Sequence, residues 1–556
     1  MPDKSKDILR CTLLFLLLLL PVFYALVAAA DLEYSWTKKA AYLAVVMVLL
    51  LLPALFLKAR TYFIVQGIFN FLFFPVEMAS LYLNRQPASA PFLEIIAHTD
   101  AAEAGELLLS LWPVCIAVIA LWVLYFTVAA RVKDRELFGP IAGKILIGCA
   151  GGAIIAGLLA MTLFLKQIHE ERTFGEAIVE ATGLVKMKLY KIYPYNLYIH
   201  ATSLLQKKHR VRRLQENVSV FRFGIHRAEP SSELYILVIG EASRYDHWGI
   251  NGYGRNTTPR LSACANLISY DSVYTQANLT EYAVSLLLTR ATAERMETAY
   301  AEKSLPEAFQ EAGAWSGYIS KQLSFDLTER IRSNCDYSRF YSKNFDLDGN
   351  YDIQMIEDLR STLADTMQFY LLHSLGSHFR YEHRYPDAFE CFKPVLGKAA
   401  GYSVLTESNK ELLVNAYDNS ILYTDWFLSS LIETVDSLDR VAAILYVSDH
   451  GESFWDDEHR LSLHGSYQVS EAEYHVPFVI WYSDEYAALY PERTAAMHKN
   501  KTTPVSTDVV FYSMLGMAGI EAISDSTRCV CSPALAPIDS VRVCTGSGAV
   551  ETMVLR

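Results

Sequence analysis

The apolar residues of this 556-residue chain are concentrated in its first third. Five apolar stretches there, at approximately 11–30, 40–57, 62–84, 106–131 and 140–165, are each long enough to cross a hydrocarbon core of about 30 Å, which takes roughly 20 helical residues. One such stretch could be a buried helix of a soluble protein. Five in succession predict an α-helical membrane domain with five spans.

The pattern changes twice after this domain. The segment "TGLVKMKLYKIYPYNLYIHATSLLQKKHRVRR" (182–213) mixes Tyr, Leu and Lys. It fits either a helix lying at the membrane surface or an amphipathic helix packed on a soluble domain, and the pattern does not choose between them. From about residue 229, short continuous apolar runs alternate with helical stretches: "LYILVIG" (234–240), "FYLLHS" (369–374) and "AAILYVS" (442–448).

Continuous runs of this kind are typical of central strands in a sheet that is covered on both faces. The sequence therefore predicts an α/β domain with a mostly parallel sheet. We expect a transmembrane domain over 1–166, interfacial linker helices over 167–228 and a catalytic domain over 229–556.

Composition and charge support this division and give it an orientation. Hydrophobic residues make up 52% of the chain and charged residues 20%, and the net charge of −12 argues against a nucleic-acid-binding protein. Basic residues cluster at 4–10, 58–60 and 131–135. The positive-inside rule places those clusters, with the N-terminus, in the cytoplasm. Five crossings then put everything after about residue 166 outside the cytoplasm.

Six cysteines lie in the outer part of the chain, and three more lie in the apolar spans. An even number in an oxidising compartment is compatible with disulfides, but fifteen pairings are open. The six are Cys264, Cys335, Cys391, Cys529, Cys531 and Cys544.

Polar residues suited to metal binding or acid–base chemistry follow each strand-like run. Glu241 follows the first, His373 and His378 accompany the second, and Asp449-His450-Gly451-Glu452 follows the third. In open α/β sheets, ligands bind beyond the carboxyl ends of the strands. Asp and His side by side supply oxygen and imidazole ligands for zinc, so this edge of the sheet is the predicted site.

Five segments in this order resemble bacterial phosphoethanolamine transferases of the alkaline phosphatase/sulfatase superfamily. They are "GEASRYDHWGINGYGRNTTP" (240–259), "TQANLTEYAVSLLLTRA" (275–291), "HSLGSHFRYEHRYP" (373–386), "SDHGES" (448–453) and "LHGSYQVSEAEYHVPFVIWY" (463–482). The resemblance covers nearly the whole chain, including the predicted spans. The first segment is its most specific part.

The resemblance implies a zinc site and a nucleophile. Its metal ligands would be Glu241, Thr280, Asp449 and His450, and His378, His464 and Glu452 would act near the transferred phosphate. Zinc would activate the Thr280 hydroxyl, which is otherwise a weak nucleophile at neutral pH. Phosphatidylethanolamine would be the donor and lipid A or a surface glycan the acceptor, at the bacterial inner membrane with the catalytic domain in the periplasm.

The chain departs from the family pattern at two places. Ala283-Val284-Ser285-Leu286 replaces the usual Ser-Val-Pro-Cys, and Phe379-Arg380 replaces the Gly-Pro that follows the family histidine. These changes concern the acceptor and the substrate pocket and leave the metal positions intact. Lys321 in "YISKQLS" could contact the donor phosphate, although a surface lysine is the simpler interpretation.

Three alternative functions compete with this one. A phosphoglycerol transferase of the lipoteichoic-acid-synthase type shares the five spans and the threonine. A sulfatase would need a Cys/Ser-x-Pro-x-Arg segment, and none follows Glu241. A non-catalytic membrane scaffold would be free to lose Glu241, Thr280, Asp449 or His450, yet all four are present.

The local sequence around Thr280 predicts the start of a helix. Asn278 and Glu281 are spaced as N-cap and third helical residue of a variant capping box. Thr280 would then lie in the first helical turn, where the positive end of the helix dipole favours an alkoxide or a bound phosphate.

Overall fold

The fold is taken from a computed structural model of the chain. It describes residues 3–28, 36–84, 87–98, 112–137, 141–168, 192–216, 218–225, 232–341, 349–398, 405–520 and 525–555, together with positions 174, 178 and 182. The described residues form two compact units that meet in the sequence between Lys207 and Lys208. The linker boundaries expected at 167 and 228 stay a prediction.

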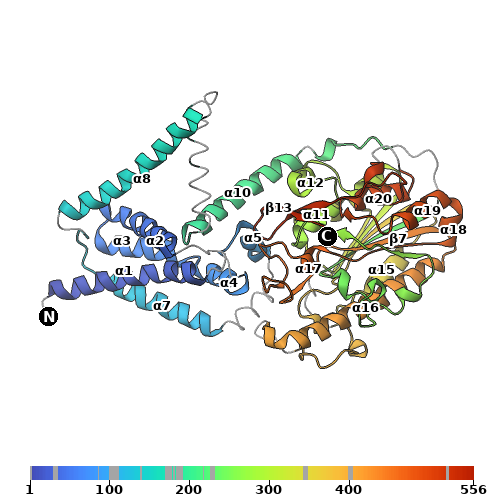
Figure 1. Ribbon diagram of the computed structural model, residues 1–556, viewed down its shortest axis with the longest axis horizontal. Coiled ribbons are helices and arrows are strands. Elements are labelled where there is room, and N and C mark those ends of the chain that lie inside the picture. The colour runs from blue at the N-terminus through green and yellow to red at the C-terminus, as the bar shows by residue number, and fades with distance from the viewer. Residues whose placement is uncertain are drawn as a thin grey trace. The chain divides into compact units, whose positions relative to one another are not determined.

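The first unit is helical, and the described parts of the five predicted apolar stretches lie mainly on helices, with 62–84 divided between two of them (Figure 1). By length and composition, three segments of the described residues could cross a membrane: Ser5–Val27, Ala59–Leu81 and Gly143–Phe164. Tyr42–Leu55 and Cys115–Ala130 are shorter apolar helices, so the count of five spans stays a prediction. The helices are α1 (Asp3–Ala28), α2 (Trp36–Leu51), α3 (Ala59–Phe71), α4 (Phe74–Asn84), α5 (Ala90–His98), α7 (Trp112–Ala130) and α8 (Ile141–Ile168).

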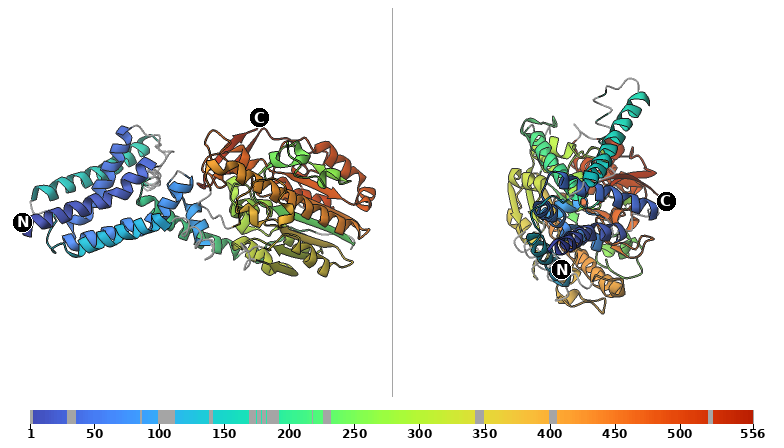
Figure 2. Two further views of the ribbon diagram at one scale, coloured as in Figure 1. Left: turned by 90° about the horizontal axis from the view of Figure 1, so that it is seen from below. Right: turned by 90° about the vertical axis from the view of Figure 1, so that its left-hand side faces the viewer.

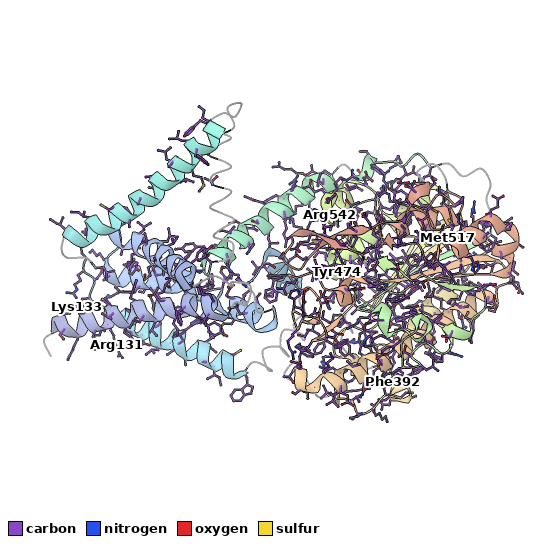
Figure 3. The ribbon with its side chains drawn as sticks, viewed as in Figure 1. Arg131, Lys133, Phe392, Tyr474, Met517 and Arg542 are labelled. Atoms are coloured by element: carbon purple, nitrogen blue, oxygen red, sulfur yellow. The ribbon has the colours of Figure 1, made fainter. Side chains whose placement is uncertain are left out.

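Basic segments that are distant in the sequence meet at one end of this unit. The Arg10 guanidinium donates to the Arg131 carbonyl over 3.0 Å, and the Lys133 N–H donates to Asp7 Oδ1 over 3.3 Å (Figure 3). The N–H of Ala59 likewise reaches the carbonyl of Arg135 at 2.7 Å. All three basic clusters therefore lie together, as an orientation by the positive-inside rule requires.

Helix α10 (Tyr195–Gln215) continues from the first unit into the second. Near its start, the Asn196 amide donates to Glu77 Oε2 over 2.8 Å, and the Tyr198 ring stacks on Phe69 at 4.2 Å between centroids. Near its end, Val211 belongs to an apolar cluster of the second unit that includes Ala277. Both ends of the helix are thus packed against protein. Most of the segment 167–191 lies outside the described residues.

The second unit is built on a seven-stranded mixed sheet with the strand order β2-β10-β7-β1-β6-β4-β5. The pairs β1–β6, β1–β7, β4–β6 and β4–β5 are parallel, whereas β10 runs antiparallel to β7 and β2. The predicted mostly parallel sheet is confirmed, and the antiparallel edge is an addition. The strands are β1 (Glu233–Gly240), β2 (Leu267–Ser269), β4 (Trp315–Ser320), β5 (Tyr337–Phe340), β6 (Gln368–His373), β7 (Val441–Ser448) and β10 (Phe478–Tyr482).

Helices cover both faces of this sheet (Figures 1 and 2). Alternate residues of the fully buried strand β1 enter two separate apolar cores: Leu237 faces one and Ile236 the other. This explains why the strand reads as a continuous apolar run. The first core contains residues of α11 (Thr280–Leu287), α13 (Leu305–Glu311), α14 (Asp326–Asn334), α18 (Asp484–Leu489), α19 (Pro491–Asn500) and α20 (Val509–Met517), and the second contains residues of α15 (Gln354–Thr362) and α16 (Lys410–Asp436).

Short elements complete the unit around the carboxyl ends of the central strands. There are three two-stranded sheets among the described residues. One pairs segments that are distant in the sequence, β3 (Val273–Tyr274) and β11 (Val505–Ser506). The other two pair adjacent segments: β8 (Ser453–Phe454) with β9 (Ser462–Leu463), and β12 (Ser540–Cys544) with β13 (Val550–Val554). Two one-turn helices, α12 (Thr298–Ala301) and α17 (Glu471–Tyr474), lie between them in the sequence.

Three residues of the segment 240–259, the most specific part of the resemblance, contact one buried carboxylate. Asp418 of α16 has no exposed side-chain surface and accepts hydrogen bonds from Arg255 (2.7 Å) and Tyr253 (2.9 Å). Its second oxygen lies 2.7 Å from His247 Nδ1. These three residues attach the loop after β1 to the long helix behind the sheet, and they do so through charge-assisted hydrogen bonds.

All nine cysteines are thiols in the structure. The sulfur atoms of Cys529 and Cys531 lie 3.0 Å apart, and both side chains are buried. The disulfide pairing among the six outer cysteines stays a prediction.

Replacement of Asp418 by Ala tests the attachment of this loop. We expect a loss of about 3 kcal/mol in unfolding free energy, because three donors, of which His247 is buried and Arg255 and Tyr253 are partly buried, lose a buried charged partner. Denaturant or thermal unfolding of the purified full-length protein measures it. Asp436→Ala, at the exposed last residue of the same helix, should change stability by less than about 0.5 kcal/mol. Equal effects of the two substitutions would contradict the proposed attachment.

Candidate metal centre

Two neighbouring parallel strands bring the metal-capable residues together. The pair β1–β7 is in register up to Gly240 and Ser448, so that Glu241 and Asp449 leave the sheet side by side. His450 and Glu452 follow Asp449 within the same loop. The strand-end argument from the sequence thus describes the observed position of this group.

Four of the predicted side chains converge on one point. Thr280 Oγ1 lies 3.2 Å from His450 Nε2 and 3.4 Å from Glu241 Oε2. His450 Nε2 in turn lies 3.5 Å from Glu241 Oε1 and 3.4 Å from Asp449 Oδ2. Four ligands placed tetrahedrally around a zinc ion at 2.0–2.2 Å are about 3.3 to 3.6 Å apart. The distances from His450 Nε2 to Thr280 Oγ1, Glu241 Oε1 and Asp449 Oδ2, which are 3.2 to 3.5 Å, fit such a centre.

The carboxylates of this group are buried without sufficient compensation from the protein. Glu241, Asp449 and Glu452 have no exposed surface, and Glu241 Oε1, Asp449 Oδ2 and Glu452 Oε1 have no hydrogen-bond partner among the described residues. Burial, followed by the charges of Asp449 and Glu452, raises the pKa of Glu241 well above its usual range. Burial is also the main cause that raises the pKa of Glu452 to about 8.

Buried carboxylates of this kind are commonly stabilised by a bound cation, because ionised groups away from water need a partner of opposite charge. The donor set of two carboxylates, one imidazole and one hydroxyl suits a divalent metal ion. The three unpartnered oxygens are the observation in this structure that supports a metal centre.

Neighbouring backbone groups orient the predicted ligands. Asp449 Oδ1 accepts the N–H groups of Ala242 (3.2 Å) and His450 (2.7 Å), which leaves Oδ2 as the oxygen free for a metal. His450 Nδ1 lies 2.9 Å from the Gly451 carbonyl. That carbonyl can only accept, so Nδ1 carries the proton and Nε2 presents its lone pair to the centre.

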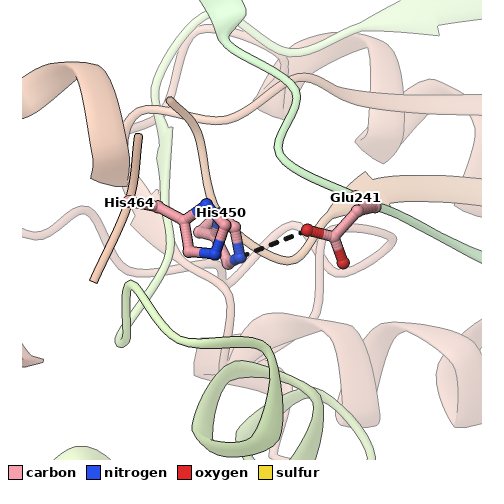
Figure 4. Close-up of side chains that lie close together, drawn as sticks. All are labelled: Glu241, His450 and His464. Atoms are coloured by element: carbon pink, nitrogen blue, oxygen red, sulfur yellow. Dashed lines mark ion pairs between the residues drawn. The ribbon is translucent and has the colours of Figure 1, made fainter. Parts of the chain in front are cut away.

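His464 is closer to the centre than the sequence suggested. Ligand atoms of Glu241, His450 and His464 all lie within 4.8 Å of one another (Figure 4). The His464 ring is 4.0 Å from that of His450 between centroids, and its Nδ1 is 3.5 Å from Glu452 Oε2. Burial lowers the pKa of His464 to about 4, so that its ring is neutral and able to donate a lone pair.

The His378 ring contacts the neighbouring backbone. Its Nδ1 lies 3.2 Å from the carbonyl of the next residue, Phe379. Its role near the transferred phosphate stays a prediction. The departure Phe379-Arg380 is accommodated by a left-handed backbone at Arg380, with φ of 66°.

Thr280 starts helix α11, although the predicted capping box is wrong. The N-cap residue is Leu279, which makes no side-chain cap hydrogen bond. The Asn278 amide is instead engaged by buried partners, donating to the Ser466 carbonyl (2.9 Å) and to Glu473 Oε2 (2.7 Å). Thr280 still occupies the first turn and remains partly exposed, as a nucleophile requires.

Lys321 was expected at the surface, and this is wrong. Its side chain is fully buried at the end of β4, and Nζ donates to Asn350 Oδ1 (2.7 Å) and to Gln354. The ammonium group also lies 3.6 Å from the centre of the Tyr341 ring. Burial lowers the pKa of Lys321 to about 8.

The analysis of the sequence missed two contributors to the site. Gln322 follows Lys321 and donates from its amide to Glu241 Oε2 over 2.9 Å. It stands at a strand end, so the argument that selected Glu241 would also have found it.

The other contributor is the hairpin of β12 and β13. The N–H of Cys544 donates to the Gln276 carbonyl (2.7 Å), and that of Gly546 donates to the Ser466 carbonyl (2.8 Å). A Cβ on Gly546 would lie 1.8 Å from the Gly465 carbonyl oxygen, so only glycine allows this approach. The hairpin thereby holds both the segment before Thr280 and the loop of His464.

Comparison with known proteins identifies the family. The sequence profile of the sulfatase family matches residues 233–520, just over half of the chain, and this range contains the converging side chains. The chain belongs to the sulfatase family. Membership of this family does not by itself assign sulfatase activity to the chain. The Cys/Ser-x-Pro-x-Arg segment that a sulfatase needs does not follow Glu241.

Curated relatives in this family bear out the resemblance to phosphoethanolamine transferases. The chain is 30% identical over 267 residues to a Kdo(2)-lipid A phosphoethanolamine 7''-transferase of Escherichia coli K12, a match of 45% of this chain and 44% of that one. It therefore spans less than half of that relative's length. It is 25% identical over 456 residues to phosphoethanolamine transferase EptC of the same organism, over 77% of this chain and 76% of that one.

Solved structures confirm the fold. The integral membrane lipooligosaccharide phosphoethanolamine transferase A from Neisseria meningitidis superposes with a TM-score of 0.69 at 20% identity, over 94% of this chain and 97% of that one. The C-terminal periplasmic domain of EptC from Escherichia coli, in complex with Zn, gives a TM-score of 0.50 at 22% identity over 57% of this chain and 90% of that one. Apolar helices followed by an alkaline-phosphatase-like domain are thus the architecture of this chain.

Asp449→Asn tests whether the buried carboxylates hold a metal. We expect the metal that copurifies with the full-length protein to fall at least tenfold, because a ligand loses its charge while Oδ1 still accepts its two N–H groups. Elemental analysis measures the metal. The metal-free variant should unfold no earlier than the metal-free parent, since a neutral amide replaces one of three neighbouring buried carboxyl groups.

Asp439→Asn is the matched control for this substitution. Asp439 is exposed at the opposite end of β7, and its left-handed backbone tolerates asparagine. Its metal content should equal that of the parent. Full metal content in Asp449→Asn would mean that Asp449 is not a ligand.

Proposed function

We propose that this chain is a zinc-dependent phosphoethanolamine transferase that moves phosphoethanolamine from phosphatidylethanolamine to a lipid A phosphate or a surface-glycan sugar. The convergence of the Thr280 hydroxyl with the carboxylates of Glu241 and Asp449 and with His450 Nε2 is the observation that supports this most directly. The names of the relatives support the transferred group and the class of acceptor.

Zinc, held by Glu241, Thr280, Asp449 and His450, would stabilise the Thr280 alkoxide and polarise a phosphoryl oxygen. The spacing of these four side chains and the zinc complex of the related periplasmic domain support this choice of metal.

The transfer takes place in two displacements at phosphorus. In the first, Thr280 Oγ1 loses its proton and bonds to the phosphorus of the donor, and the bond from phosphorus to the diacylglycerol oxygen breaks. That oxygen takes up a proton, and a phosphoethanolamine-threonine remains. In the second, an oxygen of the acceptor gives up its proton and bonds to phosphorus, the bond from phosphorus to Thr280 Oγ1 breaks, and Oγ1 takes up a proton, which restores the hydroxyl.

Side chains around Thr280 suit the proton transfers and the charge of the phosphoryl group. His464, beside Glu452, and His378 are the candidates for donating a proton to the leaving oxygen or hydrogen-bonding to the phosphoryl oxygens. Thr280 is the first residue of α11, so backbone N–H groups of that first turn add a favourable dipole for an anion.

A lipid donor explains why such a site is joined to apolar helices. We place the first unit in the bacterial inner membrane and the second in the periplasm, on the basis of the basic clusters and the likeness to an integral membrane relative. Diacylglycerol would then return to the same membrane from which phosphatidylethanolamine came.

Thr280→Ala should abolish transfer, since no oxygen remains to form the intermediate, while Thr280→Ser should keep measurable transfer. Intact-mass analysis after incubation with phosphatidylethanolamine alone should show a phosphoethanolamine adduct on the parent and none on the Ala variant. Thr298→Ala, in a different helix of the same unit, is the control and should behave as the parent. An adduct on another residue, or full activity of the Ala variant, would disprove the mechanism.

The acceptor can be identified from lipids and glycans of cells with and without the protein. Mass spectrometry should show phosphoethanolamine on lipid A or on a surface glycan only in cells that carry the unsubstituted chain. Cells that carry Thr280→Ala should match cells without the protein. Added phosphoglycerol in place of phosphoethanolamine would identify the chain as a phosphoglycerol transferase instead.

A further inference from the structure

Gln322 lies between the metal centre and the ends of two strands. Its side chain is buried, with 5% of its surface exposed. The amide nitrogen donates to Glu241 Oε2 over 2.9 Å and to the Ser374 carbonyl over 3.0 Å, so both of its hydrogens are used. Its backbone N–H donates to Ser320 Oγ over 3.1 Å.

The orientation of this amide follows from its partners. Both neighbours of the nitrogen, a carboxylate oxygen and a backbone carbonyl, can only accept, so the NH₂ group must face them. Ser374 follows β6 and Ser320 ends β4, and both strands belong to the central sheet. The amide is therefore fixed by the sheet before it contacts Glu241.

The consequence for Glu241 is that its two oxygens are unequal. Oε2 accepts the Gln322 amide and lies 3.4 Å from the Thr280 hydroxyl, whereas Oε1 is buried without a hydrogen-bond partner and lies 3.5 Å from His450 Nε2. A carboxylate without such a donor can turn so that both oxygens approach a metal. With the donor in place, one oxygen is engaged and the other faces the centre.

We infer that Gln322 is a positioning residue of the metal centre: its amide holds the Glu241 carboxylate in an orientation that binds the metal through one oxygen. Donors that fix ligating carboxylates in this way raise metal affinity and define the coordination geometry. The inference rests on the proposed function, because it assigns to Gln322 a role toward the zinc of that site.

A role in packing alone would not require an amide. Gln322 fills a buried position that a residue of equal size and no hydrogen-bonding groups would also fill. What such a residue lacks is the pair of donors aimed at Glu241 and Ser374. Gln322→Met makes this change with nearly constant volume.

Gln368 supplies a matched control in the same sheet. It begins β6, at the far end of the strands from the metal centre, and it is fully buried. Its amide nitrogen donates to the Thr362 carbonyl over 2.9 Å and to the Tyr370 hydroxyl over 3.2 Å, and its Oε1 accepts the Ala364 N–H over 3.0 Å. Gln368→Met thus removes three hydrogen bonds, two of them from an NH₂ group as in Gln322→Met, at a position where no predicted metal ligand is touched.

The experiment measures zinc binding to the full-length protein by competition with a chelator. We expect Gln322→Met to raise the zinc dissociation constant about tenfold to a hundredfold and Gln368→Met to leave it unchanged. The visible absorption of the cobalt-substituted protein, which reports coordination number, should change in Gln322→Met alone. Unfolding of the metal-free proteins gives the loss of stability that the two variants share.

Each outcome bears on a different statement. If the parent binds zinc and Gln322→Met binds it equally tightly with the same cobalt spectrum, the inference is wrong and the proposed function stands. A parent that binds no zinc overturns both. Should Gln322→Met fail to fold, Gln322→Asn replaces it: its amide is shorter by one methylene and cannot reach both acceptors, so the same weakening is expected and unchanged affinity refutes the inference.

Discussion

The burial of several carboxylates at one point is the constraint on which the rest of this structure depends. Parallel pairing of β1 and β7 forces Glu241 and Asp449 together, and the loop after β7 adds Glu452. In the absence of a cation, these groups repel one another and lose their hydration. A divalent cation bound among these groups would remove this repulsion. Thr280 Oγ1 and His450 Nε2, 3.2 Å apart, lie where they would complete the ligand set of such a cation.

The loop network behind the centre can be understood from the same constraint. Side chains that repel one another stay close only if other contacts hold the loops that carry them. The segment after β1 is held in this way by its hydrogen bonds to Asp418. On the other side, Glu473 accepts from Asn278 and from Ser453, which joins the start of α11 to the residue after Glu452. None of these contacts is made by a predicted metal ligand, yet they help to fix where the predicted ligands lie.

The strand-end argument was sufficient to predict that Glu241, Asp449 and His450, the proposed ligands after β1 and β7, lie together. Continuous apolar runs were sufficient for the central strands. Thr280 was different, since its local sequence predicts only a helix start, and its importance came from the family resemblance. The capping box failed because Asn278 has buried tertiary partners that no local pattern reveals. Lys321 was misplaced because charged residues are usually exposed, whereas here a ring and two amides accommodate the ammonium group. The antiparallel edge strand β10 and the contacts of the final hairpin depend on pairing between distant segments, which periodicity does not encode.

The late position of the β12–β13 hairpin in the sequence affects when the site can form during synthesis. Cys544 and Gly546 supply backbone hydrogen bonds to the segment of Thr280 and the loop of His464, and the ribosome adds them after every residue of the centre. Apolar helices at the start of the chain are synthesised first, and domains generally begin to fold in that order. The growing chain therefore carries all side chains of the proposed metal centre before the hairpin that supports the Thr280 segment exists. The contacts that hold the Thr280 segment and the His464 loop therefore form only after this hairpin has been synthesised, and a nascent chain that lacks the hairpin lacks them.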